Sequence, residues 1–225
     1  MRKLWILGLL VTCGALCVGQ TAQVKTASFP LDSVTGLQMT NGRVEVVSYR
    51  GRRAVHFLPP SRPGEEADPM AIVNGTQFRE GTIEVDVAGF PGKSADSGNR
   101  GFVGIAFRVK DGLKGEYFYL RPTNGRAEDQ LRRNHAVQYM SLPDYPWNRL
   151  RKENPGVYES YVDLEPGVWT KMKIVVSGTK ARLYVNGAAQ PCLIVNDLKL
   201  GETEGQIALW AVDGTEAYFS NLQVY

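Results

Sequence analysis

Short segments that alternate apolar and polar residues recur from residue 43 to the end of the chain, and they constrain its fold more than any other feature. Each is rich in β-branched and aromatic residues, and glycine, asparagine or aspartate stands between most of them. A period of two is typical of half-buried strands, and no window shows a sustained helical period. Many short strands at near-regular spacing predict a β-sandwich or a barrel. The segments are RVEVVSY (43–49), RAVHFL (53–58), GTIEVDVAG (81–89), GFVGIAFRV (101–109), EYFYL (116–120), WTKMKIVVSG (169–178), ARLYVNG (181–187), CLIV (192–195), GQIALWAV (205–212) and AYFSNLQVY (217–225).

Turn residues indicate where the chain reverses. Asn186-Gly187 and Asp213-Gly214 suit tight hairpins, which need a positive φ. The stretch PPSRPGEEADP, residues 59–69, is rich in proline and charge, so we expect a surface loop there.

The first 19 residues have the pattern of a signal peptide. Arg2 and Lys3 precede an apolar WILGLLV run that is too short to span a bilayer, and small residues follow it. We expect cleavage after Gly19, with Ala22 as the alternative. The protein is then exported, either to a periplasm or into the medium.

After this leader we expect a loose tether over residues 20–28 and one domain over residues 29–225. A lipoprotein anchor is less favoured, because Leu16 stands where a small residue should precede the modified Cys17. No other segment suggests a span across a membrane.

Loss of the leader changes the charge and the cysteine content. The whole chain has 26 basic and 23 acidic residues, a net charge of +3, and the mature chain has 24 − 23 = +1. Such a near-neutral balance gives no support for a nucleic-acid partner. Cys13 and Cys17 leave with the leader, so the remaining Cys192 has no partner for an internal disulfide.

The order of the strand segments resembles that of concanavalin A-like jelly rolls. The blocks that carry the resemblance are GTIEVDV, GFVGIAFRV, GVWTKMKIVVSGTKARLYVNG and GQIALWA with AYFSNLQV. More narrowly, roughly residues 40–225 are similar to the laminin-G-like and 3-keto-disaccharide hydrolase domain families of secreted bacterial proteins. The resemblance implies an all-β sandwich of two antiparallel sheets. It selects no single activity, because this fold hosts lectins, hydrolases and adhesion modules.

Alternation along the strands assigns side chains to faces. The residues expected in the core are Ile83, Val85, Val87, Val103, Ile105, Phe107, Val109, Phe118, Leu120, Ile207, Leu209 and Ala211. The polar and aromatic residues expected to face outward are Glu84, Asp86, Arg108, Tyr117, Tyr119, Arg121 and Trp210.

If these outer faces share one curved sheet, they form a groove suited to a sugar. Aromatic rings pack on the apolar face of a pyranose, and forked polar groups bind its hydroxyls. An ordinary solvated sheet face is the alternative for any single polar residue. Trp210 is less ordinary, since an outward tryptophan needs a cover, either a ligand or a loop of the protein itself. We therefore expect Trp210→Ala to weaken ligand binding more than folding.

Residues 121–151 break the alternation. The stretch has six arginines and no lysine against three acids, a balance of 6 − 3 = +3. It is too long for a hairpin turn, and its apolar and aromatic residues can anchor it, so we expect an ordered loop insertion packed over the groove. AVQYMS (136–141) is a candidate strand within it.

Two interpretations of this insertion stay open. In the structural one, its arginines bind the loop's own carbonyls and the carboxylates of Asp129, Asp144 and Glu159. In the functional one, its polar and aromatic residues face a ligand. The residues concerned are Arg132, Arg133, Asn134, His135, Gln138, Tyr145 and Trp147.

The motif of a retaining glycosidase is incomplete. On this fold such enzymes typically carry Glu-x-Asp-x-(x)-Glu on one strand, with two glutamates about 5–5.5 Å apart. Here Glu84 and Asp86 are followed by Ala88 and Gly89, so the second glutamate is missing. If the protein is an enzyme, His135 is the candidate general base, because imidazole exchanges protons near neutral pH.

Cofactors are not indicated. The chain has two histidines, His56 and His135, and no Cys/His cluster with metal-ligand spacing. Calcium could bind aspartate and asparagine oxygens, but no spacing specifies a site.

The function we predict is that of an exported carbohydrate-recognition domain. A glycoside hydrolase of the 3-keto-disaccharide hydrolase type is the alternative, and a protein-binding laminin-G-like module is a second alternative.

Overall fold

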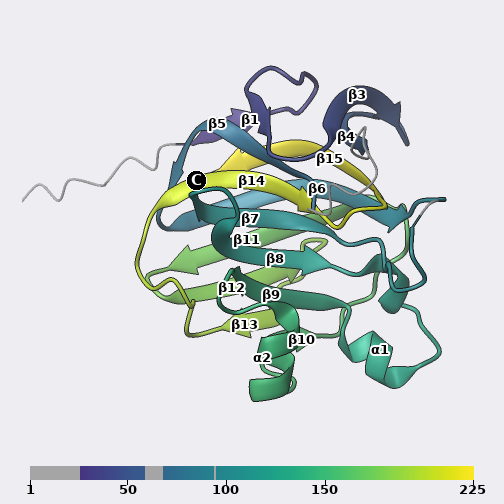
Figure 1. Ribbon diagram of the computed structural model, residues 1–225, viewed down its shortest axis with the longest axis vertical. Coiled ribbons are helices and arrows are strands. Elements are labelled where there is room, and N and C mark those ends of the chain that lie inside the picture. The colour runs from purple at the N-terminus through teal and green to yellow at the C-terminus, as the bar shows by residue number, and fades with distance from the viewer. Residues whose placement is uncertain (1–25, 59–67, 94) are drawn as a thin grey trace, which may run out of the picture.

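The computed structural model describes residues 26–58, 68–93 and 95–225. In this part of the chain two antiparallel sheets pack face to face (Figure 1). One sheet has eight strands, in the order β13 (Leu193–Val195), β12 (Lys180–Val185), β11 (Thr170–Ser177), β6 (Gly81–Pro91), β15 (Thr215–Val224), β4 (Arg52–Leu58) and β3 (Arg43–Tyr49), with β1 (Ala27–Phe29) paired to β15. The other has seven, in the order β10 (Glu159–Ser160), β9 (Val137–Leu142), β8 (Lys114–Leu120), β7 (Val103–Lys110), β14 (Gly205–Ala211), β5 (Met70–Phe78) and β2 (Leu37–Met39).

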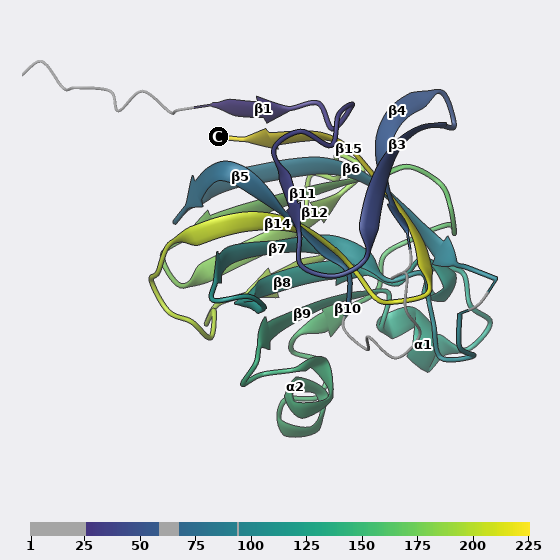
Figure 2. The same ribbon diagram turned by 45° about the horizontal axis from the view of Figure 1, so that its top comes forward.

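Apolar residues on alternate positions of the strands fill the space between the sheets. Ile83, Val85 and Val87 of β6 are fully buried, as are Ile105 and Phe107 of β7. Each such side chain stabilises the fold by about 1.5–3 kcal/mol relative to an exposed one. The turned view in Figure 2 shows the two layers, with the β3–β4 hairpin rising beside them. The predicted sandwich of two antiparallel sheets is confirmed.

The chain passes repeatedly from one sheet to the other, as in a jelly roll. One such passage is the turn that joins β14 to β15, closed by a hydrogen bond from the Thr215 N–H to the Val212 carbonyl at 3.1 Å. Gly214 has the expected positive φ of 76° there. The prediction of a hairpin at Asp213-Gly214 was wrong, however, because its two strands belong to different sheets.

The turn after β12 has the backbone expected for an Asn-Gly pair. Asn186 has a φ of 51° and Gly187 a φ of 73°. The Ala188 N–H donates to the Val185 carbonyl at 3.1 Å across the turn. A longer connection then leads to β13, which pairs with β12.

The predicted insertion is ordered, and part of it belongs to the sheet. The strand expected over residues 136–141 is β9, and it extends the seven-stranded sheet next to β8. Three short helical segments, which the sequence analysis did not predict, flank it: η1 (Pro122–Asn124), α1 (Gln130–Asn134) and α2 (Trp147–Glu153). Asp129 caps α1 by accepting a hydrogen bond from the Arg132 N–H. Helices of one or two turns leave too few residues for a helical period to be recognised.

The sheet includes the last two residues of the tether predicted over residues 20–28. Ala27 and Ser28 pair with Val224 and Gln223 of β15, so strand β1 already belongs to the sheet. The signal peptide, both of its cysteines and residues 59–67 of the predicted surface loop lie outside the described residues. Within those that are described, no helix has the length and apolar character needed to cross a membrane, and Cys192 is a free thiol.

Candidate functional site

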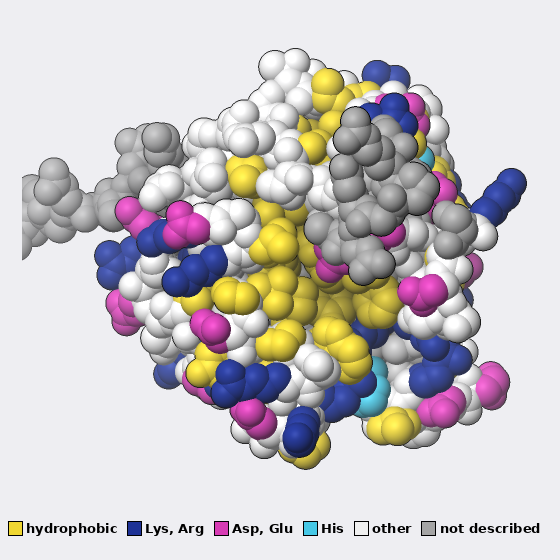
Figure 3. All heavy atoms as spheres, in the orientation of Figure 1, with side chains coloured by type: hydrophobic (Ala, Val, Ile, Leu, Met, Phe, Trp, Pro, Cys, Tyr) yellow, Lys and Arg dark blue, Asp and Glu magenta, His cyan; other side chains and the backbone are white. Residues whose placement is uncertain are grey.

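A hollow of about 560 Å³ lies on the seven-stranded sheet, on the face turned away from the sandwich core. Figure 3 shows an apolar floor in the middle of this face, with basic side chains and a histidine along one edge. The residues that line the hollow are Asp68, Gly98, Arg100, Phe102, Tyr119, Arg121, Asn124, Arg132, His135, Met140, Leu142, Pro146, Trp147, Arg151, Trp210 and Val212.

One row of side chains crosses the sheet beneath the hollow. Trp210 of β14 pairs with Gly104 of β7, and Gly104 pairs with Tyr119 of β8. The row continues to Gln138 of β9 and then to Glu159 of β10. Because paired residues on antiparallel strands point to the same side, these five residues share one face. The row thus runs from an aromatic side to a polar and charged side.

Gly104 lets the two aromatic rings meet. A Cβ at this position would lie 2.6 Å from the Cβ of Tyr119, and nearer still to the Phe118 carbonyl oxygen. Without that atom, the rings of Tyr119 and Trp210 approach to 5.1 Å between centroids.

Trp210 faces away from the sandwich core, as its phase predicted, but it is not an open platform. It is only 2% exposed, and its ring also packs edge-on against Tyr117 at 5.8 Å. A cover by the protein itself is one of the two possibilities for an outward tryptophan, and the burial of Trp210 matches it. The expectation that Trp210→Ala weakens ligand binding more than folding stays a prediction, and the burial of the side chain indicates that the variant also loses stability.

Trp147 and Phe102 supply the accessible rings. Trp147 is the first residue of α2 and is 44% exposed. The guanidinium of Arg151 lies 4.8 Å from its ring centroid, and that of Arg121 lies 5.8 Å from it. Arg121 also lies 5.6 Å from the ring centroid of Phe102. Guanidinium groups thus lie against the rim rings, that of Arg151 from the same helix as Trp147 and that of Arg121 from the end of β8.

Glu159 collects three basic side chains at the polar edge. Its carboxylate, only 4% exposed, accepts two near-parallel hydrogen bonds from Arg151, at 3.0 Å from Nε and 2.7 Å from Nη2. Arg121 Nη1 lies 3.7 Å from Oε2, and His135 Nε2 lies 3.1 Å from Oε1. The structural interpretation of the insertion thus holds for Arg121 and Arg151, which contact Glu159. The carboxylates of Asp129 and Asp144 do not take that part: Asp129 caps α1, and Arg149 donates to the backbone carbonyl of Asp144.

Arg121 binds the polar end of the row. Its Nη2 donates to the Tyr119 hydroxyl at 2.9 Å and to Gln138 Oε1 at 2.6 Å. Its Nη1 donates to the His135 carbonyl at 3.2 Å, and the Asn124 side chain donates to the same carbonyl at 3.1 Å. These bonds fix the guanidinium over the sheet.

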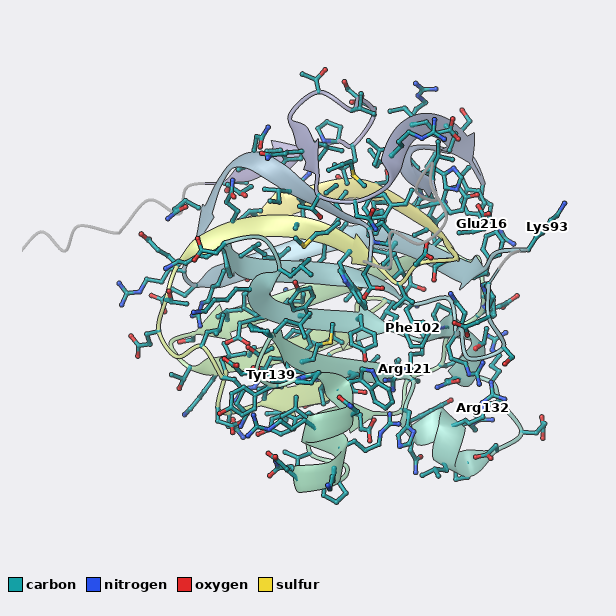
Figure 4. All side chains as sticks on the ribbon, viewed as in Figure 1. Lys93, Phe102, Arg121, Arg132, Tyr139 and Glu216 are labelled. Carbon is teal, nitrogen blue, oxygen red and sulfur yellow. The ribbon has the colours of Figure 1, made fainter. Side chains whose placement is uncertain are left out.

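Arg132 joins this group from α1. Its Nη2 approaches Asn124 Oδ1 to 3.5 Å. Figure 4 shows Arg132 on the same side of the molecule as Arg121, with Phe102 next to Arg121. Arg121 after β8, Arg132 on α1 and Arg151 on α2 therefore all line the hollow.

Burial shifts the pKa of several groups around the hollow. It lowers the pKa of His135 below its ordinary 6.5, and the Glu159 carboxylate partly opposes that shift. At the β5 side of the hollow, burial raises the pKa of Asp68 to about 6. The Tyr119 hydroxyl has a raised pKa, again through burial, so it stays protonated at neutral pH.

A second hollow of about 560 Å³ lies on the other side of His135 and Arg151, which line both hollows. Asn134 lines this second hollow and not the first. Arg133 lies outside both: it covers the ring of Tyr161 at 5.1 Å and donates to its hydroxyl at 3.1 Å. Tyr145 likewise packs under Arg149 at 4.5 Å and does not line the hollow.

Glu84 and Asp86 do not contribute to the hollow. Both lie on β6, in the eight-stranded sheet, whereas the hollow is on the seven-stranded one. Asp86 pairs with Arg52 at 2.7 Å and with Lys171 at 3.3 Å. The assumption that all outward faces belong to one sheet was wrong here, because alternation gives a side chain's face but not its sheet.

Arg108 is also absent from the hollow. A β-bulge in β7 interrupts the pairing between Phe107 and Lys110, and Arg108 has a φ of 55°. Its fully buried guanidinium donates to three backbone carbonyls, those of Arg79, Gly178 and Gly201, at 2.6–2.9 Å. An extra residue shifts the alternation, so the outward position predicted for Arg108 was wrong.

Several residues that line the hollow were not predicted as site residues from the sequence. They are Asp68, Arg100, Phe102, Asn124, Met140 and Leu142. Met140 had a recognisable signal, since it is two residues beyond Gln138 on the same strand and shares its face. The others come from loops and strand ends, where no period assigns a direction. No cluster of potential metal ligands occurs among the described residues.

Comparison with known proteins shows the fold. No family model and no curated protein matches the sequence. Among solved structures, the carbohydrate-binding module CBM66 from Bacillus subtilis matches with a TM-score of 0.55 and 17% identity, over 85% of this chain and 96% of that one. Domain 4 of AbnA, a GH43 extracellular arabinanase from Geobacillus stearothermophilus, in complex with arabinotriose, matches with a TM-score of 0.52 and 12% identity, over 91% and 93% of the two chains.

A Bacillus subtilis protein with a galectin-like fold gives a TM-score of 0.53 at 14% identity, over 88% of this chain and 94% of that one. The chain thus has the concanavalin A-like jelly-roll fold that its sequence resembles.

Proposed function

We propose that the protein binds a carbohydrate in the hollow of the seven-stranded sheet. The observation that carries this proposal is the exposed ring of Trp147, which stands at the rim beside fixed guanidinium groups. A sugar ring offers an apolar face to such an aromatic group and hydroxyls to the forked donors. The volume of about 560 Å³ is within the range of small-molecule sites.

The comparisons support the same proposal. CBM66 is a carbohydrate-binding module, and the AbnA domain was solved with arabinotriose. Both share the fold of this chain over most of its length. Their ligands are properties of those proteins, so the glycan of this protein has to be found by experiment.

A titration with a panel of oligosaccharides tests the proposal. Trp147→Ala should abolish or strongly weaken binding, and quenching of tryptophan fluorescence by the sugar should disappear with it. Trp169→Ala is the matched control, because Trp169 packs on Tyr49 at the eight-stranded sheet, away from the hollow. Binding that survives in Trp147→Ala and is lost in Trp169→Ala would place the sugar on the other sheet.

Cleavage of a glycoside is the second candidate, favoured by the contact of His135 with Glu159 at 3.1 Å on the wall of the hollow. A carboxylate beside an imidazole can orient it for proton transfer. Turnover should be assayed on glycosides and 3-keto-glycosides. Activity lost in His135→Gln and kept in Glu84→Gln supports this role, and the reverse result contradicts it. If no glycoside is turned over, binding alone remains.

A further inference from the structure

We propose that the sugar bound in the hollow is acidic, carrying a carboxylate or a sulfate that the guanidinium groups at the polar edge bind. This inference rests on the proposed function and specifies the class of its ligand. It comes from the balance of charges around the hollow, their positions, and the hydrogen bonds that fix them.

The described residues around the hollow carry more positive than negative charge. Four arginines line it, and Asp68 is the one acid among the lining residues. Adding Glu159, which lies behind the wall, gives 4 − 2 = +2. The whole sequence, by comparison, has 26 basic and 23 acidic residues, a net charge of +3 over 225 residues.

The charges are also separated across the sheet. Asp68 lies two residues before the start of β5, whereas Arg121 and Arg151 contact Glu159 on β10, at the opposite side of the strand order. Arg121 directly follows β8, and three strand spacings of about 4.8 Å between β5 and β8 put the two strands roughly 14 Å apart. Asp68 therefore does not neutralise the basic edge.

At that edge the Glu159 carboxylate is the counter-charge of two guanidinium groups, those of Arg121 and Arg151. Glu159 satisfies Arg151 with a forked pair and stands 3.7 Å from Arg121. Arg132 approaches only the amide oxygen of Asn124, at 3.5 Å, and has no carboxylate within ion-pair distance among the described residues. Figure 3 shows basic side chains beside a histidine at the border of the apolar floor.

Guanidinium groups held in this way suit an oxyanion better than a hydroxyl. Their planar donors match the two oxygens of a carboxylate or sulfate, and such charge-assisted bonds are roughly twice as strong as neutral ones. Both terminal nitrogens of Arg121 donate to Tyr119, Gln138 and the His135 carbonyl, so Arg121 contributes a fixed positive charge. The donors left for a ligand are the Arg132 guanidinium and Nη1 of Arg151, because Glu159 takes Nε and Nη2 of Arg151.

Two pairs of probes test the proposal by calorimetry. The first is an oligogalacturonide and its methyl ester, and the second is a sulfated galactose oligosaccharide and its desulfated form. We expect at least one charged member to bind about tenfold or more tightly than its neutral partner. The pair that shows the difference identifies the anion as carboxylate or sulfate. The preferred probe should also lose affinity as NaCl rises from about 50 to 500 mM.

A matched pair of variants assigns the effect to the edge of the hollow. Arg132→Gln should weaken binding of the charged probe about tenfold more than binding of the neutral one. Arg182→Gln removes the same charge from an exposed position on β12, in the other sheet, and should change neither. Equal binding of charged and neutral members overturns the acidic ligand but leaves sugar binding intact. Failure of all four probes and of the wider panel overturns both.

Discussion

The side chains of Arg151 and Glu159 form a forked ion pair, in which Nη2 lies 2.7 Å and Nε 3.0 Å from carboxylate oxygens. Arg151 belongs to α2 and Glu159 to β10, so the pair fastens the helix of the insertion to the edge of the sheet. Arg151 also lines both hollows. One contact therefore holds the insertion in place and shapes the candidate site.

Glu159→Gln should lower the free energy of unfolding by about 2–3 kcal/mol. The substitution keeps the shape but leaves Arg121 and Arg151 without a counter-charge, and the partial exposure of Arg151 keeps the loss below that of a fully buried pair. Urea unfolding at neutral pH measures it. Arg126→Gln, which breaks exposed pairs with Asp163 and Glu165, is the control and should change stability little. Equal effects of the two variants would contradict the importance of the buried carboxylate.

Trp210→Ala should cost about 3–5 kcal/mol of stability, because its buried ring packs on Tyr117 and Tyr119. Trp147→Ala should cost less than about 1 kcal/mol, since 44% of Trp147 is exposed. Chemical unfolding of both variants measures the difference. If Trp210→Ala is as stable as the wild type, Trp210 does not support the floor.

Asp68→Asn should stabilise the protein at neutral pH. The folded state raises the pKa of Asp68 from 3.8 to about 6, so ionisation of this carboxyl disfavours the fold. The penalty is absent below about pH 4, grows between pH 4 and 6, and is complete above pH 6. The shift of 6 − 3.8 = 2.2 corresponds to on the order of 3 kcal/mol. Unfolding free energies of the wild type and the variant from pH 4 to 8 should diverge over this window; a constant difference would falsify the assignment.

His135 should titrate below pH 6.5. Burial lowers its pKa, while the Glu159 carboxylate raises it. NMR titration of the imidazole, assigned with His135→Gln, measures the midpoint. In Glu159→Gln the midpoint should move lower still, because the opposing charge is gone. A midpoint above 6.5 would show that the ion pair outweighs burial.

The thiol of Cys192 should react slowly in the folded protein. Burial raises its pKa from 9.0 to about 11, which lowers the thiolate fraction at pH 8 about a hundredfold. Labelling with a thiol reagent in the presence and absence of urea compares the reaction rates of the folded and unfolded protein.

For the mature chain we also expect reductant to leave the melting temperature unchanged, because cleavage of the predicted signal peptide would remove the other two cysteines. A large drop would indicate a disulfide between chains or a retained leader.

Alternation in the sequence predicted most of the strands and the residues between the sheets. Ile83, Val85 and Ile105 are buried where their phase placed them. The same rule put Tyr119 and Trp210 on the opposite face, where they line the hollow. Composition also marked the insertion, in which Arg121 and Arg151 contact Glu159. These features are local, since a strand's period depends only on the order of its own residues.

Tertiary structure decided which of those faces form a site. Glu84 and Trp210 both point outward, yet β6 and β14 belong to different sheets, so the two residues lie on opposite sides of the sandwich. A bulge turned Arg108 into the interior, and loops brought Phe102 and Arg100 to the hollow. The sequence by itself determined the strands, the core and an arginine-rich insertion. Strand pairing between distant segments determined the site, because hydrogen bonds and packing across the sheet are non-local and leave no period in the chain.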